Sequence, residues 1–371
     1  MRAYTTFLSL AGLISAAGAF PQYSVTRMAT LAPGLAPFHA INSVGNMIKP
    51  YLSNPSRLLL RNVDGSYALS SGAPSGYSNG GSYALSDNNR VAGSLSRSYD
   101  PIKAYPMTWS QETGYDILPS PIVSTEPSAA YDMYAINENA TVFGGSFNTY
   151  IGGVHNYVPT RWHQSGSSWV GESFNGEGVC MEFDQSGNAY GRFNGRSGIW
   201  STDGTVGYLP SPYSVFNQAV GRDDQGHTYG QTVENNAEFW VWDTPTSTPR
   251  RYPISTFPYY QFFPMRVNGS GTCIYTTEKV PSSGLLNGFL WSESTGSVQL
   301  DNLLLPEDAA MYQVGAVKAI NDQGVILAFA RDPALPSVEF GVVLTPVPEP
   351  ATLLLMSVGI GYLVAQRRKR R

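Results

Sequence analysis

Residues 135–144, with the sequence AINENATVFG, decide the fold of this chain because versions of the same ten residues recur along it. The pattern is a small and an apolar residue, then Asn, Asp or Ser, two polar residues, a Gly or small residue, and a short, mostly apolar end. The copies start at Ala40, Ala84, Ala135, Glu182, Gly221, Arg266 and Ala319, and are clearest at Ala84, Ala135, Gly221 and Ala319. The successive starts lie 44, 51, 47, 39, 45 and 53 residues apart. Such a period is typical of repeat folds, including propellers.

Each copy predicts a β-hairpin. The third residue of the pattern, as in Asn137, Asp223 and Asn321, can hydrogen-bond to its own backbone and close a turn. A glycine at the sixth position, as in Gly226 and Gly324, supplies the positive φ that a tight hairpin turn requires. The same two roles are expected at Asp184 and Asn268, and at Gly45, Gly187 and Gly271.

A tryptophan followed by a polar turn predicts a third and a fourth strand after most copies. The cases are Trp109 with Gly114, Trp162 with Gly166, Trp200 with Gly204, Trp291 with Gly296, Trp242 with a proline-containing turn, and Leu60 with Gly65 in the first copy. Four short strands in about 45 residues match one propeller blade. We therefore predict an all-β fold, a β-propeller over residues 20–346, with seven blades and with six as the alternative count.

The last copy has no tryptophan-turn ending, so its sheet needs a strand from elsewhere. The alternating residues Tyr23–Met28 stand before the first copy. We expect them to pair with the last sheet and close the ring, because that pairing removes two open sheet edges.

Composition agrees with this fold. The chain has 38 Gly and 23 Tyr, and only 13% of its residues are charged, which favours strands and turns over helices. The formal charge is −4 for the whole chain and −10 for residues 20–350. An acidic body repels phosphate backbones, so no nucleic acid partner is expected.

Both ends of the chain indicate export. Arg2 precedes an apolar stretch, and Ala17-Gly18-Ala19 predicts cleavage of a signal peptide, residues 1–19, before Phe20. At the other end, residues 347–371 combine Pro348-Glu349-Pro350 with an uncharged, mostly apolar segment, 351–365, that predicts a short transmembrane helix. The five cations that follow predict a cytoplasmic stop, and they are Arg367, Arg368, Lys369, Arg370 and Arg371.

This tail closely resembles the PEP-CTERM sorting domain of Gram-negative bacteria. The resemblance implies that an exosortase, a membrane protease-transpeptidase, recognises Pro348, Glu349 and Pro350 in a precursor anchored in the inner membrane, and then releases or transfers the protein to the cell surface. Proteins of this family occur in bacteria that make exopolysaccharide. A plain tail anchor is the alternative. The turns at Ala135 and Ala319 also resemble the repeats of extracellular HAF-type proteins, which implies an exported, propeller-like protein and no known catalytic residues.

The residues that could carry chemistry are few. No P-loop, Gly-x-Ser-x-Gly, His-Glu-x-x-His or Cys-x-x-Cys sequence is present. A glycan-cleaving enzyme needs two carboxylates, and the candidates are Glu182, Asp184, Asp223, Asp224 and Asp322, whose repeat positions favour turn capping instead. His163 and His227 are expected at turns or rims. A calcium site at residues 223–226 is too short for an EF-hand.

Two cysteines and two aromatic groups remain. Cys180 and Cys273 belong to copies that are not neighbours, so we predict two buried free thiols. The aromatic residues 257–263, and Tyr150, His155 and Tyr157 in a long loop, could stack on sugar rings or pack between blades.

We therefore predict an exported, surface-directed, non-enzymatic protein that binds or scaffolds part of the cell envelope or extracellular matrix, with extracellular polysaccharide as a candidate partner. No cofactor or metal is expected. The alternatives are an exopolysaccharide hydrolase or lyase of propeller fold, and an envelope protein that binds copies of itself.

Overall fold

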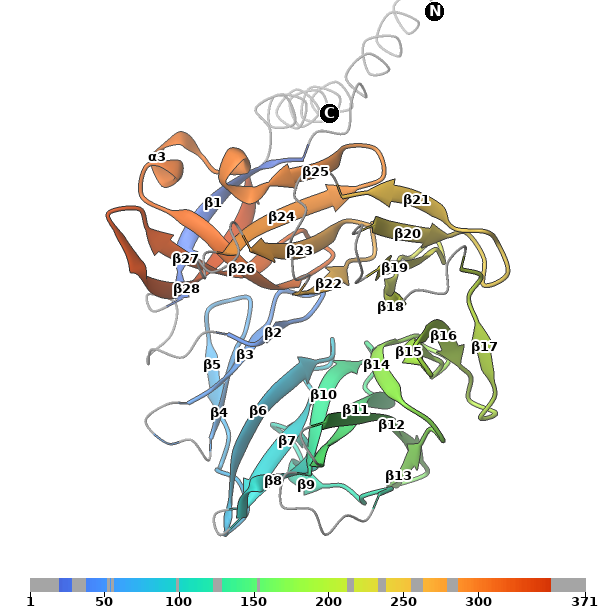
Figure 1. Cartoon of the computed structure of the whole chain (residues 1–371). Helices are drawn as coiled ribbons and strands as arrows, with labels where there is room; N and C mark the ends of the chain where they lie inside the picture. The colour runs from blue at the N-terminus through green and yellow to red at the C-terminus, as the bar shows by residue number, and fades with distance from the viewer. Residues whose placement is uncertain are drawn as a thin grey trace, which may run out of the picture.

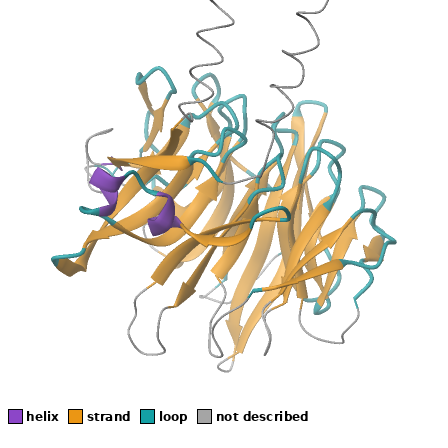
Figure 2. Cartoon of the chain, turned by 90° about the horizontal axis from the view of Figure 1, so that it is seen from above, coloured by secondary structure: helices purple, strands orange, loops and turns teal. Residues whose placement is uncertain are grey.

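The computed structural model describes residues 20–28, 38–51, 54, 57–97, 100–122, 129–151, 154–211, 217–232, 238–254, 263–278 and 286–347. Within these residues the chain is almost entirely antiparallel β-sheet, with two short helical turns (Figure 2). The predicted signal peptide, Pro348-Glu349-Pro350, segment 351–365 and the terminal cations lie outside the described residues. Among the residues that are described, no helix has the length and apolar character needed to cross a membrane.

The strands form five four-stranded sheets and one eight-stranded sheet. In chain order, the strands are β1 (Gln22–Arg27), β2 (Ala40–Ile41), β3 (Met47–Pro50), β4 (Leu58–Arg61), β5 (Tyr67–Leu69), β6 (Tyr77–Leu85), β7 (Val91–Arg97), β8 (Asp100–Ser110), β9 (Gly114–Ile117), β10 (Ala130–Ile136), β11 (Val142–Ile151), β12 (Val154–Ser165), β13 (Ser168–Ser173), β14 (Gly178–Phe183), β15 (Ala189–Phe193), β16 (Arg196–Trp200), β17 (Val206–Tyr208), β18 (Asn217–Arg222), β19 (Thr228–Thr232), β20 (Glu238–Trp242), β21 (Arg250–Pro253), β22 (Phe263–Val267), β23 (Cys273–Glu278), β24 (Leu286–Ser292), β25 (Gly296–Gln299), β26 (Gln313–Ile320), β27 (Ile326–Asp332) and β28 (Leu335–Val347).

The sheets follow one another around a common centre in chain order (Figure 1). The eight-stranded sheet consists of two antiparallel meanders, β6–β9 and β10–β13, which meet at one parallel pair, Ala104 with Ala130. This arrangement confirms the predicted all-β, propeller-like fold.

The innermost strand of several sheets has an irregular register just before the repeated turn. The register shifts between Met133 and Ala135, and again between Cys180 and Glu182. Equivalent shifts occur in β18 and β26. A bulge of this kind bends the strand and re-aims the side chains beside it. It therefore helps to set which side chains face the common centre.

Apolar clusters fill the space between consecutive sheets. In one of them, Ile48 and Leu60 of the first sheet pack with Trp109 of the next. Another joins Met47 of the first sheet to Leu327 of the last, so the packing continues around the ring. The predicted tryptophans are all 3% exposed or less, because their rings lie in these layers.

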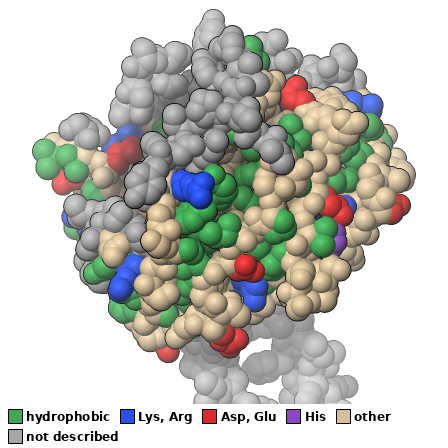
Figure 3. Space-filling view, turned by 90° about the horizontal axis from the view of Figure 1, so that it is seen from below, with side chains coloured by type: hydrophobic (Ala, Val, Ile, Leu, Met, Phe, Trp, Pro, Cys, Tyr) green, Lys and Arg blue, Asp and Glu red, His purple; other side chains and the backbone are tan. Residues whose placement is uncertain are grey.

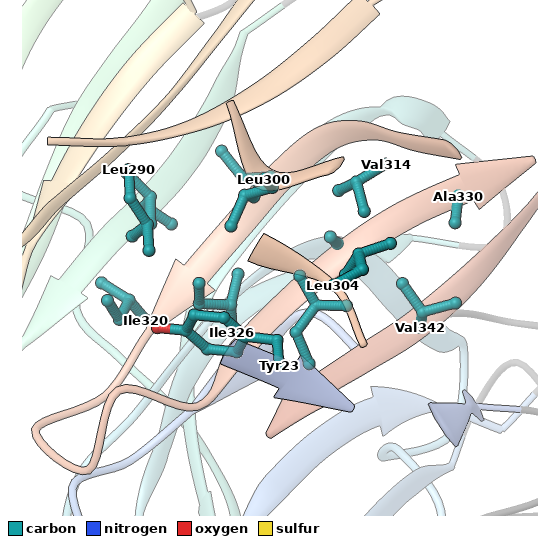
Figure 4. Packing of buried hydrophobic residues seen from close by; sticks show 13 residues of the cluster. Tyr23, Leu290, Leu300, Leu304, Val314, Ile320, Ile326, Ala330 and Val342 are labelled. Carbon is teal, nitrogen blue, oxygen red and sulfur yellow. The ribbon is translucent and has the colours of Figure 1, made fainter. Parts of the chain in front are cut away.

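The N-terminal strand closes the ring as predicted. β1 pairs antiparallel with β28 from Gln22 opposite Val347 to Arg27 opposite Val342. Tyr23 is 2% exposed and packs in the cluster that contains Leu304 and Ile326, as Figure 4 shows. Burial of the Tyr23 side chain therefore holds β1 in the last sheet.

Two local features differ from what the sequence indicates. The Ser- and Gly-rich residues 70–81 are typical of a flexible loop. However, β6 begins at Tyr77, and the Ser70 side chain is buried and accepts a hydrogen bond from the N–H of Leu58 at 2.8 Å. Short helical turns at η1 (Leu300–Leu303) and α3 (Pro306–Ala309) were not expected. Pro306 starts α3, where its fixed φ suits the first helical position.

Candidate functional site

The repeated ten residues form the same turn in each copy. At Asn137, the side-chain oxygen accepts a hydrogen bond from the N–H of Thr141 at 2.9 Å, and the carbonyl accepts one from the N–H of Ala140 at 2.9 Å. The sixth residue has positive φ in every copy, and these residues are Gly45, Asn89, Ala140, Gly187, Gly226, Gly271 and Gly324. The turn is therefore set by hydrogen bonds among its own residues, and it keeps the same conformation where the sixth residue is not glycine.

Neighbouring turns are also linked to one another. The side-chain amide of Asn42 donates to the carbonyl of Ser86 at 3.0 Å, and that of Asn268 donates to the carbonyl of Asn321 at 3.1 Å. Asn321 in turn donates to the carbonyl of Asn42 at 3.2 Å, which joins the last copy to the first. The turns thus surround the axis as a partly hydrogen-bonded ring.

A cavity of about 530 Å³ lies within this ring, and each of the seven copies contributes to its lining. Four carboxylates occupy the fourth position of their turns, at Asp87, Glu138, Asp224 and Asp322. Three of them also bond to a neighbouring turn: the N–H of Ser43 donates to Asp87 at 3.0 Å, the side-chain amide of Gln185 donates to Glu138 at 2.5 Å, and the N–H of Gly269 donates to Asp322 at 2.6 Å. Burial raises the pKa of Glu138, and the other three carboxylates raise it further. Their negative charges therefore act on the same space.

Two opposite charges occupy the first position of the pattern inside the cavity. That position is Ala or Gly in five copies, but it is Glu182 and Arg266 in the other two. Burial raises the pKa of Glu182 to about 7, although the N–H of Phe183, which donates to its carboxyl at 3.2 Å, and the Arg266 charge oppose this. Burial lowers the pKa of Arg266, and Glu182 opposes that change. The cavity can therefore offer a polar ligand both a guanidinium and a carboxyl group.

The carboxylates predicted to cap turns divide into three groups. Asp184 and Asp223 do cap their own turns, through the N–H groups of Asn188 and His227. Asp224 and Asp322 line the cavity at the fourth position. Glu182 is a correction, because it lies inside the cavity before the turn begins.

Sequence reasoning missed a polar cluster around Asp223. His227 Nδ1 lies 2.8 Å from Asp223 Oδ2, and the hydroxyl of Tyr229 donates to the same oxygen at 2.9 Å. His227 Nε2 faces Asp243 at 3.7 Å. The spacing of four residues between Asp223 and His227 was the available signal. Both ring nitrogens face carboxylates, so this histidine ties strands together, and no nucleophile lies among the contacts described for it.

The other predicted positions are scattered. Among the described residues, no group of three or more His, Cys, Asp or Glu side chains is arranged to hold a metal ion. Cys180 and Cys273 are buried free thiols, as predicted. His163 is not in a turn: it lies in β12, with Nδ1 3.5 Å from a Glu172 oxygen.

Neither His155 nor Tyr157 is among the described residues that line the cavity. Tyr150, His155 and Tyr157 were expected in a loop, but they lie in the long antiparallel strands β11 and β12, where the rings of His155 and Tyr157 stack 5.9 Å apart. Of the other aromatic group, residues 257–263, all but Phe263 lie outside the described residues. On the face seen in Figure 3, charged side chains are dispersed among larger uncharged areas.

Comparisons with known proteins agree with both parts of the molecule. Residues 346–371 match the PEP-CTERM protein-sorting motif. YCF48 from Cyanidioschyzon merolae has a TM-score of 0.50 and 10% identity, over 87% of this chain and 99% of that chain. YCF48 bound to D1 peptide has a TM-score of 0.49 and 11% identity, over 90% and 98%. No curated protein matches this chain. The first structural match supports the fold alone.

The fold and the tail together define a class of protein: an exported protein with a propeller-like body and a C-terminal sorting signal. The chain carries the PEP-CTERM motif, which implies processing by an exosortase and delivery to the cell surface.

Proposed function

We propose that this protein is a seven-bladed, non-enzymatic propeller that binds or scaffolds a component of the cell envelope or extracellular matrix, with extracellular polysaccharide as the ligand class. The blade count is supported by the turns, because each copy of the pattern supplies one innermost strand. It is also supported by the seven apolar clusters: six lie between successive sheets, and one lies between the two meanders of the eight-stranded sheet. The eight-stranded sheet then counts as two blades.

The observation that carries the binding role is the axial cavity. Its volume of about 530 Å³ lies within the range of small-ligand sites, about 300–1,000 Å³. Glu182 and Arg266 replace the small residue that the repeat uses elsewhere, and burying such groups costs free energy. A ligand that hydrogen-bonds to both side chains would offset this cost, which is why we assign them to ligand binding.

Binding can be tested with purified protein on an array of polysaccharide fragments. Arg266→Gln and Glu182→Gln should each weaken binding of any fragment that the cavity holds by about tenfold, since each removes one charged hydrogen-bonding group. Asp203→Asn, in the exposed turn between β16 and β17, is the matched control and should leave the binding affinity unchanged. Binding that is equal in all four proteins would place the ligand elsewhere, and the absence of any binding would contradict the proposed role.

One feature favours the alternative, an exopolysaccharide hydrolase or lyase. A carboxyl group with a pKa near 7, as at Glu182, is what a general acid at neutral pH requires. This function predicts new reducing ends or unsaturated products from a polysaccharide, and their loss in Glu182→Gln.

The proposed route begins with removal of residues 1–19 after Ala19. The precursor is then held in the inner membrane by segment 351–365, with the terminal cations in the cytoplasm, until the motif at 348–350 is processed. Mass spectrometry of the C-terminal peptide from surface and membrane fractions tests this route. An intact Arg371 in the surface fraction would contradict it.

A further inference from the structure

The last paired residue of the closing strand pair is also the residue before the sorting motif. Val347 lies opposite Gln22, and Pro348 follows Val347 without a spacer. Phe20, the first residue after the predicted signal cleavage site, packs against the apolar cluster of the same sheet. Both predicted processing positions therefore lie at one end of a single two-stranded ladder.

β1 is held on both of its edges. On the edge toward β28, the hydroxyl of Ser24 donates to the carbonyl of Thr345 at 3.4 Å. On the other edge, the N–H of Leu305 donates to the carbonyl of Tyr23 at 2.9 Å, and the N–H of Val25 donates to Asp308 at 2.8 Å. Asp308 is 8% exposed, so this charge-assisted hydrogen bond is shielded from water.

A protease that recognises an extended segment bonds to its backbone on the residues around the cleaved bond, in the manner of an added strand. The residues directly before the motif are Thr345, Pro346 and Val347, and the closed ladder pairs them with β1. A cleft that encloses these residues has to displace β1 from them. The folded ladder and the enzyme therefore compete for the same backbone.

We propose that the β1–β28 ladder restrains the sorting step, and that the exosortase acts on chains in which the end of this ladder has opened. The opening is local, because the part of β1 from Gln22 to Val25 can separate from β28 while the other strands of the last sheet stay paired. The rate of tail removal then follows the equilibrium between closed and open ladder ends.

The first test separates the motif from the ladder. Six Gly and Ser residues are inserted between Val347 and Pro348 in the full-length protein, and tail removal is followed by pulse-chase labelling in the native host. The insertion should speed processing about fivefold or more, since opening no longer limits the rate. The same insertion between Asp203 and Gly204, in an exposed turn, should leave the rate within about twofold.

The second test weakens the ladder from its other edge. Asp308→Ala removes the acceptor for the Val25 N–H and should speed processing about tenfold, in line with a lost charge-assisted hydrogen bond. Asp308→Asn keeps an oxygen acceptor and should restore most of the parental rate. If Asp308→Ala fails to fold, the insertion variant still decides, since it leaves the ladder intact. An unchanged or slower rate in the insertion variant would overturn the proposal.

Discussion

At the scale of single residues, the repeated turn combines one invariant geometry with varied side chains. The sixth position has positive φ in every copy, yet Asn89 and Ala140 stand there instead of glycine. The left-handed conformation costs a non-glycine residue free energy, because its Cβ approaches the following carbonyl. Ala140 therefore carries local strain that the surrounding hydrogen bonds compensate.

Replacing Ala140 with glycine should relieve this strain. We expect Ala140→Gly to raise the free energy of unfolding by about 1 kcal/mol, measured by urea denaturation. Gly324→Ala is the converse and should lower it by about 1–2 kcal/mol. The added Cβ at Gly324 would also lie 3.2 Å from Pro346. A destabilised Ala140→Gly protein would mean that the buried methyl group matters more than the backbone strain.

Glu182 makes the stability of the body depend on pH. Its pKa is raised by burial to about 7, above the ordinary value, so the folded protein keeps a proton that the unfolded chain loses. The stability gained in this way is full below the ordinary pKa and is lost as the pH rises through about 7. Relative to Glu182→Gln, the parent should therefore lose about 1–2 kcal/mol between pH 4.5 and pH 7.5. Parallel stability curves for the two proteins would refute this assignment.

At the scale of elements, the sheets are joined by the same few contacts. Trp162 Nε1 donates to the carbonyl of Pro119 at 2.7 Å, and Trp242 Nε1 donates to the carbonyl of Pro210 at 2.8 Å. Trp162 thus anchors the segment after β9, and Trp242 anchors the segment after β17. Together with the asparagine links between turns, these bonds hold neighbouring parts of the ring together.

Asn321 is the link at the seam between the last and first copies. Asn321→Ala removes the bond to the Asn42 carbonyl and the acceptor for the Val325 N–H, and should cost about 2–3 kcal/mol in unfolding free energy. Asn321→Ser keeps a short side-chain acceptor, as Ser86 does in its own turn, and should cost less than half as much. Chemical denaturation measures both, and equal losses would show that only the seam bond counts.

The turns could be predicted from the sequence, whereas the cavity could not. Asn137 and Gly226 act within a few residues of themselves, so their spacing alone indicates a turn. The placement of Glu182 beside the axis depends on the bulge before it and on the other sheets around the ring. The Ser- and Gly-rich composition around Tyr77 does not indicate a strand. Strand β6 forms there because it pairs with β7.

At the scale of the whole molecule, closure by β1 makes the sheets interdependent. Every sheet packs against the sheet before it and the sheet after it, and β1 covers the edge of β28 in the last sheet. We expect the parent protein to unfold in a single calorimetric transition. Val25→Pro removes the N–H that Asp308 accepts and interrupts the ladder, so it should add an earlier transition and cost about 3 kcal/mol. Val25→Thr keeps the N–H and should retain the single transition.

The closed ladder also makes circular permutation of the chain possible. Because Gln22 lies opposite Val347, the described body of residues 20–347 begins and ends at the same place on the ring. A short linker there, with new ends opened at an exposed turn such as residues 203–204, would give a circular permutant with the same sheets in the same cyclic order. The order of the sheets around the ring is therefore independent of where the chain enters it, and in this protein the entry point lies beside the PEP-CTERM motif.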